Sequence, residues 1–247
     1  MELLDENGFR TDGRRALEFR RIHCEVGYAK NCEGSAYFQQ GLTKVVAVVR
    51  GPKEVNPNKS KALKDRATLK CTIGFAPFSN SERQVTRSRF DRKAQEWALL
   101  LKRCFERVII LSLYPHSVIY ICCTITHADG SELCACINAT TMALINASIN
   151  IVDYVTCCTC GFYRGDMVLD LNSQEESIHS LAVFVIALTN ERKQIALMES
   201  HSRVHADHTE QIFELAKEGC LQVYDVIASI TRRHVYSIAR SVFKPEE

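Results

Sequence analysis

The sequence lacks the features that mark several classes of protein. Its 31 Lys and Arg residues nearly balance 29 Asp and Glu residues, which leaves a formal net charge of +2. This balance excludes a histone-like polycation and an acidic tail, so any nucleic-acid contact must come from a local basic patch. No apolar run reaches the about 20 residues of a membrane-spanning helix, and we expect no membrane role.

Cysteine is abundant, with 12 residues, but the spacing fits neither a disulfide framework nor a complete zinc site. The start, MELLDENGFRTDGRR, carries no apolar signal segment, which predicts reduced cysteines in a cytosolic or nuclear protein. Only Cys157 and Cys160 have the Cys-x-x-Cys spacing of structural zinc, and no second such pair completes the set. Because "VTCCTCGF" and "IYICCTIT" are strand-like apolar runs, we expect their cysteines to pack in the core. A zinc-binding protein remains the alternative.

Hydrophobic periodicity predicts strands and two helices in the first half of the chain. Residues 36–40 alternate and residues 44–50 form a β-branched run ending at Gly-Pro, which predicts a hairpin that turns at Gly41. A further strand is expected in "ATLKCTIGFAPFS", and two more about Pro115 in "RVIILSLYPHSVIYICCTIT". Helical spacing begins at Asp91, and the small-residue run "LCACINATTMALINASI" predicts a second helix.

The second half of the chain predicts strands followed by one helix. Strands are expected in "VTCCTCGFYRGDMVLDLN" and "LAVFVIALTNERKQIALMES", and a long helix from about Thr209 to Val242. No Gly- or Pro-rich linker separates the halves. We therefore predict two α/β halves of related layout, whose strand order periodicity alone does not give.

A cluster of carboxylates follows the first strands of the second half. The stretch "DMVLDLNSQEES", residues 166–177, holds Asp166, Asp170, Glu175 and Glu176 beside Asn172. Taken alone, such a cluster is typical of a metal site or of general acid catalysis.

Four motifs in this order resemble the RNase PH family of phosphate-dependent 3'-to-5' exoribonucleases, over nearly the whole chain. They are "GFRTDGRRALEFRRI", "GSAYFQQGLTKVVAVVRGPKE", "ADGSELCACINATTMAL" and "VLDLNSQEE". The wording "EGSAYFQQGLTKV" and the Gly-Pro-Lys-Glu ending look most like the exosome branch, and one ring subunit within it. The resemblance implies an α/β (α+β), ribosomal protein S5 domain 2-like fold of two βαβα-type halves. The expected halves are residues 1–152 and 153–247, packed as one compact unit.

The same resemblance implies partners and a cellular setting. Family members of the exosome branch form a ring of RNase-PH-like subunits around a channel that admits single-stranded RNA. We therefore expect other RNase-PH-like ring subunits, S1/KH-type cap proteins and a hydrolytic exoribonuclease subunit as partners. The expected locations are nucleus, nucleolus and cytoplasm.

The phosphate-binding loop departs from the pattern of active members, in which it resembles Ala-Asp-Gly-Gly-Thr-Arg and binds phosphate at a helix start. Here residues 128–133 read Ala-Asp-Gly-Ser-Glu-Leu. Ser131, Glu132 and Leu133 thus form a degenerate phosphate site, because Leu133 has no donor and Glu132 repels phosphate. A charge-assisted hydrogen bond contributes about 1.5–3 kcal/mol, so losing two such donors predicts loss of phosphorolysis. An active phosphorolytic exoribonuclease remains the alternative.

The carboxylate cluster then resembles the remnant of a catalytic site. Asp170 matches the first catalytic carboxylate of active members, and Glu176 stands where a second Asp is usual. We expect no cofactor, with magnesium at Asp170 left open.

RNA contact needs positive charge but no reactive geometry. Arg66 in "LKDRATL" resembles a channel-lining residue of the family, and Arg92 and Lys93 resemble a pair that grips the RNA backbone, with Arg89 close by in the sequence. With no RRM, KH or aromatic stacking motif, contacts are expected on phosphate and sugar. A solvated basic surface is the alternative.

Overall fold

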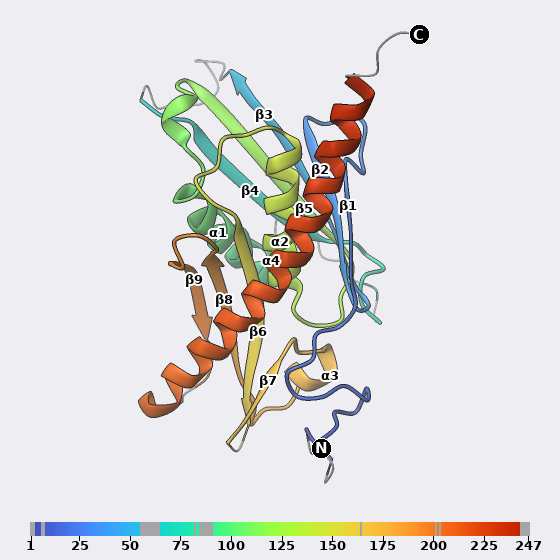
Figure 1. Cartoon of the computed structure of the whole chain (residues 1–247). Coiled ribbons are helices and arrows are strands. Elements are labelled where there is room, and N and C mark those ends of the chain that lie inside the picture. The colour runs from blue at the N-terminus through green and yellow to red at the C-terminus, as the bar shows by residue number, and fades with distance from the viewer. Residues whose placement is uncertain are drawn as a thin grey trace.

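The structure, a computed structural model, describes residues 3–5, 8–54, 65–81, 83, 91–163, 165–200, 202 and 204–242. Two β-sheets and the helices packed on them make up these residues (Figure 1). The first sheet has the strand order β1-β2-β3-β5-β4, and the second the order β7-β6-β8-β9. The predicted fold class is confirmed.

The first sheet and its helices come from the first half of the chain. β4 and β5 run parallel, joined through α1, and the other neighbours are antiparallel. The predicted hairpin is confirmed, with Ala36 opposite Ala47 across its two strands. The elements are β1 (Ile22–Val26), β2 (Gly34–Gln40), β3 (Thr43–Glu54), β4 (Thr68–Phe75), α1 (Arg92–Glu106), β5 (Ser117–His127) and α2 (Glu132–Asn146).

One predicted strand is wrong. The run before Pro115 forms a 3-10 helix at Leu111–Leu113, and its only β-type pairing in the described chain is an isolated bridge from Ile109 to Ile151. Val108 and Ile109 donate their backbone N–H groups to Phe105 O, at the end of α1. The apolar residues of this run are buried because they close the end of a helix, and a buried apolar run does not by itself reveal a strand.

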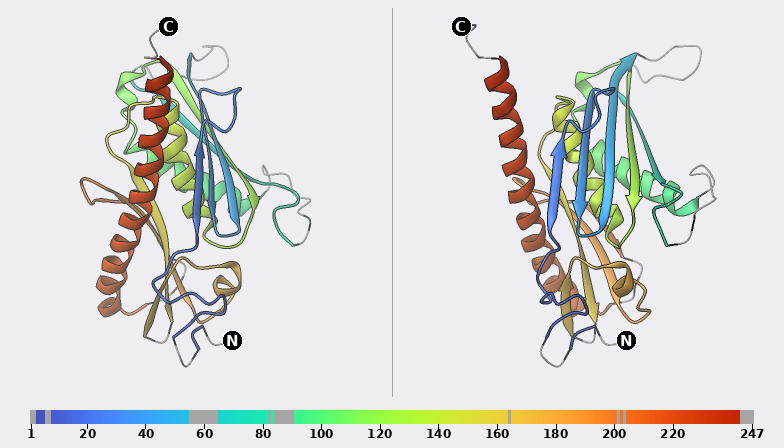
Figure 2. Two further views of the ribbon diagram at one scale, coloured as in Figure 1. Left: turned by 45° about the vertical axis from the view of Figure 1, so that its right-hand side comes forward. Right: turned by 90° about the vertical axis from the view of Figure 1, so that its right-hand side faces the viewer.

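The second sheet is antiparallel throughout. The predicted long helix is confirmed and begins slightly earlier, at Ala206. It packs along β6 and reaches β1 of the first sheet, so that it spans both halves, and the described ends of the chain lie at opposite ends of the molecule (Figures 1 and 2). The elements are β6 (Val155–Tyr163), β7 (Asp166–Leu169), α3 (Ser173–Glu176), β8 (Ala182–Thr189), β9 (Ile195–Ser200) and α4 (Ala206–Val242).

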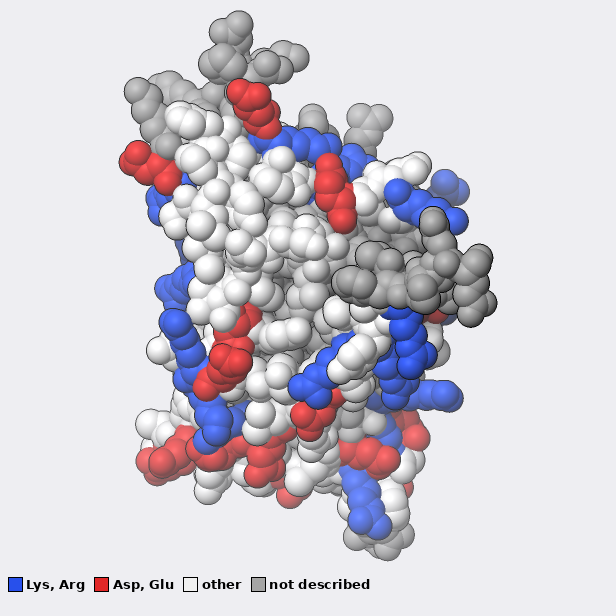
Figure 3. Space-filling view, turned by 45° about the horizontal axis from the view of Figure 1, so that its top comes forward, with Lys and Arg blue, Asp and Glu red and all other residues white. Residues whose placement is uncertain are grey.

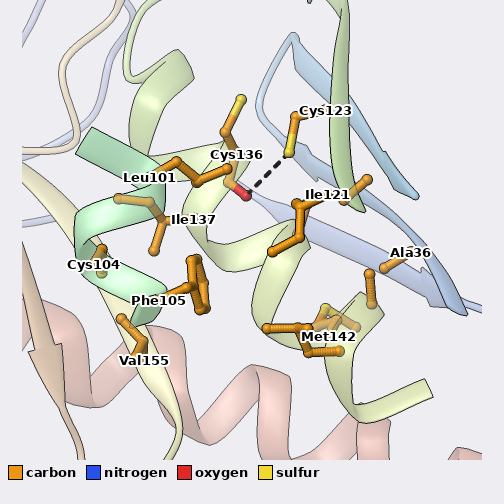
Figure 4. Packing of buried hydrophobic residues seen from close by; sticks show 14 of the residues in the cluster. Ala36, Leu101, Cys104, Phe105, Ile121, Cys123, Cys136, Ile137, Met142 and Val155 are labelled. Carbon is orange, nitrogen blue, oxygen red and sulfur yellow. Dashed lines mark hydrogen bonds between the residues drawn. The ribbon is translucent and has the colours of Figure 1, made fainter. Parts of the chain in front are cut away.

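Helix α2 is the shared core of both sheets. It packs on β2 and β3 with one side and on β6 with another, and every residue from Glu132 to Leu144 is buried. Small residues allow this close packing, since a Cβ added at Gly34 would lie 2.3 Å from the carbonyl oxygen of Ala143. Figure 4 shows the side chains around Ile137 and Met142 that fill the space between α2, α1 and the first sheet.

Nine of the twelve cysteines are buried. All twelve are free thiols, and Cys123, Cys157, Cys158 and Cys160 are buried, so the core-packing prediction is confirmed for these four, whereas Cys122 is only half-buried. Cys123 donates to the backbone oxygen of Cys136 (Figure 4). The described residues contain no cluster of three or more His, Cys, Asp or Glu side chains that could hold a metal ion. None of the described helices is both long and apolar enough to cross a membrane.

The N-terminal segment is tied to the second half by a buried arginine. Arg10, which is 2% exposed, donates to Glu175 Oε1 at 2.8 Å and to the backbone oxygens of Leu169 at 2.6 Å and Asp170 at 2.8 Å. A second contact joins its Nη2 to Glu175 Oε2. This ion pair holds the segment before β1 against β7 and α3 (Figure 1).

We predict that Arg10→Met lowers the free energy of unfolding by about 3–5 kcal/mol, because it leaves the buried carboxylate of Glu175 without a partner. Chemical denaturation of the purified protein measures this change. The exposed Arg15→Met is the matched control and should change stability by less than about 0.5 kcal/mol. If Arg10→Met behaves like this control, the ion pair does not hold the segment.

Candidate functional site

The predicted remnant carboxylate Asp170 is locked in an ion pair. It follows β7 with a positive φ of 55° and is 0% exposed. Arg20 Nη2 donates to its Oδ1 at 2.6 Å, Arg20 Nε lies 3.0 Å from both oxygens, and the backbone N–H of Arg20 donates to Oδ2 at 2.8 Å. Both oxygens of Asp170 are therefore already satisfied by one residue of the N-terminal segment.

Asp170 does not fit the magnesium ion that the family resemblance leaves open. Mg²⁺ takes oxygen ligands in near-octahedral geometry and usually keeps several waters. The carboxylate of Asp170 faces an arginine in a fully buried position, which leaves neither free oxygens nor room for such a shell. We assign Asp170 the role of positioning the surrounding loops.

Arg20 joins the loop before α2 to the loop before α3. Its Nη1 donates to the backbone oxygen of Asp129 at 2.6 Å and its Nη2 to that of Leu171 at 3.1 Å. Gly130 permits the close approach, since it has a φ of +77° and a Cβ there would lie 2.5 Å from the carbonyl carbon of Asn172. The position of the α2 start is thus set by contacts between distant parts of the chain.

The start of α2 is occupied by a carboxylate of the protein itself. The backbone N–H of Ser131 donates to Glu176 Oε1 at 2.8 Å, and the Ser131 hydroxyl donates to the backbone oxygen of Leu171 at 2.8 Å. Leu133 is buried, with 3% exposure. One backbone donor of this helix start is therefore engaged by Glu176, and the side chains of Glu132 and Leu133 add no donor for an anion at the degenerate phosphate site.

A pocket of about 480 Å³ lies directly in front of this helix start. It brings together Glu132, Glu176, Lys93 and Trp97, with apolar walls from β8. The Lys93 ammonium lies 4.4 Å from the centre of the Trp97 ring and 5.8 Å from that of Phe75. The structure thus separates the two predicted remnant carboxylates, because Glu176 lines this pocket and Asp170 lies in the ion pair behind it.

The pocket has an excess of negative charge. Burial, and next the neighbouring carboxylate of Glu132, raise the pKa of Glu176 to about 7. The Ser131 N–H, Lys93 and Arg20 offset this rise only in part. An anion entering the pocket would meet these carboxylates, so the arrangement opposes the binding of phosphate.

The predicted RNA-binding residues fall into two separate places. Arg92 and Lys93 form the exposed first turn of α1, capped by Asp91, whose side chain accepts from the Lys93 N–H at 3.0 Å. Arg66 is exposed before β4, at the end opposite to Phe75, so about 25 Å of strand separates it from Lys93. Arg89 lies outside the described residues. Charges of both signs alternate around the face shown in Figure 3, with a largely uncharged centre.

Two residues of the site were missed from the sequence. Arg20 stands next to Arg21 in an arginine-rich stretch, and no local pattern distinguishes the buried one from its neighbour. Trp97 occupies one apolar position in the helical spacing that begins at Asp91, and it also faces the pocket. Being the only tryptophan of the chain was its one distinguishing signal.

Comparison with known proteins reveals relatives over nearly the whole chain. Two family models match, "3' exoribonuclease family, domain 1" over residues 18–150 and "3' exoribonuclease family, domain 2" over residues 153–219. The exosome complex component RRP41 of Mus musculus is 40% identical over 242 residues, 98% of each chain. The exosome complex component Rrp41 of Thermococcus gammatolerans is 33% identical over 242 residues, which cover 98% of this chain and 96% of the relative.

Solved structures share the fold. Rice (Oryza sativa) Rrp46 matches with a TM-score of 0.80 at 22% identity, over 90% of this chain and 100% of that one. An Archaeoglobus fulgidus structure, described as the exosome with RNA bound to the active site, matches with a TM-score of 0.76 at 18% identity, over 89% and 92%.

The expected similarity to one exosome ring subunit, ribosomal RNA-processing protein 41 or exosome component 4, is confirmed by the 40% identity to RRP41, which is the abbreviation of the first name. With both family models and full-length relatives in agreement, the chain belongs to the RNase PH family, in its exosome branch.

Proposed function

We propose that the protein is a non-catalytic RNase-PH-like ring subunit of the RNA exosome core. In this role it supports 3'-to-5' RNA processing and degradation by forming part of the channel that threads single-stranded RNA to an associated nuclease. Its partners are other RNase-PH-like ring subunits, S1/KH-type cap proteins and a hydrolytic exoribonuclease subunit. It acts in nucleus, nucleolus and cytoplasm and needs no cofactor.

The observation that carries this proposal is the hydrogen bond from the Ser131 N–H to Glu176. Phosphorolysis brings inorganic phosphate against an RNA phosphodiester, so two anions must be held together by cations and donors. At the start of α2 the amide donor serves Glu176, and the next two positions are an acid and a buried leucine. The pocket therefore has the wrong charge for the attacking phosphate.

RNA conduction makes smaller chemical demands, because it requires only positive charge along the path of the backbone. Lys93 supplies exposed charge at the pocket, its neighbour Arg92 is exposed on the same helix turn, and Arg66 supplies charge at the far end of β4. The separation of the two places suits an extended strand that contacts the protein more than once. The Archaeoglobus fulgidus relative of the same fold is described with bound RNA.

The second candidate function is an active phosphate-dependent 3'-to-5' exoribonuclease. Full-length similarity to a family of 3' exoribonucleases favours it. For this activity, phosphate would have to displace the carboxylate of Glu176 from the Ser131 N–H while the negative charge of Glu132 repels it.

We predict that the assembled protein releases no nucleoside diphosphates from labelled single-stranded RNA at millimolar phosphate, since the phosphate grip is missing. Thin-layer chromatography of the products measures the release. Because Asp170 is structural, Glu176→Gln is the informative variant. The unaltered protein and Glu176→Gln are assayed side by side at equal purity. Diphosphate release by the unaltered protein that disappears in Glu176→Gln would contradict the proposal.

We further predict that Arg92→Glu combined with Lys93→Glu weakens RNA crosslinking to the assembled core about tenfold, because phosphate contacts are lost. Ultraviolet crosslinking with radiolabelled RNA measures it, and gel filtration checks that assembly is intact. The matched control reverses Arg232 and Arg233, two exposed arginines on α4. Equal crosslinking by both double variants would show that the α1 pair is merely solvated.

A further inference from the structure

The pocket in front of α2 is lined by a carboxylate that has no hydrogen-bond partner among the described residues, on a residue that is otherwise buried. Glu132 is 8% exposed and lines the pocket, yet no hydrogen bond to its side chain exists within the described residues. No Lys or Arg nitrogen among these residues lies within 4.0 Å of the carboxylate of Glu132 or of Glu176. The carboxylate of Glu132 therefore faces the pocket without a counter-charge from the described residues, and a cation that enters the pocket would supply one.

The other walls of the pocket restrict which cation fits. Trp97 presents an aromatic surface that already attracts one cation, Lys93. Ile178, Leu181 and Val183 add apolar surface, which suits a group with an aliphatic stem. A hard metal ion would need more oxygen ligands than two carboxylates, and the described residues offer no cluster of three metal-binding side chains.

We propose that this pocket binds a guanidinium group, with Glu132 and Glu176 accepting its N–H donors and Trp97 lying against its plane. A guanidinium carries five N–H donors in a planar fork, which allows it to serve two carboxylates from different helices at once. Its weak hydration and flat shape suit an aromatic, partly apolar wall better than the compact ammonium of lysine does. About 480 Å³ is ample for an arginine side chain.

Two sources can supply this group: an arginine side chain of a partner protein, or a free small guanidinium compound. The inference rests on the proposed function in one respect, because a pocket that takes a cation does not take phosphate. Phosphate and guanidinium are therefore tested separately on the same protein.

Trp97 is the only tryptophan of the chain, so it reports directly on the pocket. The full chain, labelled with 5-fluorotryptophan, gives one ¹⁹F resonance that N-acetyl-arginine amide should shift in a saturable way. N-acetyl-citrulline amide, the uncharged isostere, should cause no shift, and N-acetyl-lysine amide should bind at least about tenfold more weakly. Glu132→Gln should weaken the arginine probe by about tenfold or more, whereas the exposed Glu54→Gln should leave it unchanged.

Repeating the titration in the assembled ring, with only this subunit labelled, separates the two sources. If a partner's arginine fills the pocket, assembly itself shifts the resonance, and the probe then has no further effect. If a free compound is the ligand, the resonance still responds to the probe after assembly.

Three results would overturn the inference: no response to the arginine probe in folded protein, an equal response in Glu132→Gln, or equal binding of the arginine and lysine probes. Saturable binding of inorganic phosphate at the same resonance would overturn the proposed function as well. The absence of binding by either ligand would overturn the guanidinium site alone. If Mg²⁺ shifts the resonance in a saturable way and the arginine probe does not, the pocket is a metal site and the guanidinium inference is wrong.

Discussion

The buried ion pair between Arg20 and Asp170 is the interaction on which the geometry of the site depends. It joins the N-terminal segment to the end of β7, and the same guanidinium reaches the loop before α2. Breaking one partner of such a pair costs about 3–5 kcal/mol, because the other charge stays buried. Replacing both by apolar groups is often neutral in stability, so the pair contributes chiefly the defined position of these loops.

The Arg20–Asp170 ion pair sets the positions of the loops at the site, whereas other side chains set its charge. Arg20, Asp170 and Gly130 still bring the start of α2 against the loop before α3, as a phosphate site at a helix start requires. Glu176 accepts the Ser131 N–H at this helix start, and Glu132 adds a second negative charge beside it. This arrangement places two carboxylates beside the helix start, of which Glu176 accepts the Ser131 N–H and Glu132 has no partner among the described residues.

Much of the fold could be predicted because its elements carry clear periodicity. The hairpin of β2 and β3 and the helices α1 and α4 follow from alternation and from helical spacing. The apolar run before Pro115 was wrongly predicted to be a strand, because its residues are buried where the chain leaves the end of α1. The site residues were identified through motif resemblance. The motif does not show that Asp170 and Glu176 have different surroundings, because Asp170 pairs with Arg20 and Glu176 accepts the Ser131 N–H only in the folded chain.

The sequence by itself determined the family, most of the strands and helices, and the absence of donor side chains at Glu132 and Leu133, because each depends on residue type and local spacing. Tertiary structure decided which arginine is buried, which carboxylate faces a cavity and how far apart the basic residues lie. Arg20 pairs with Asp170 across 150 positions of the chain. Contacts of that kind depend on how the two sheets pack about α2, and local sequence patterns carry no record of them.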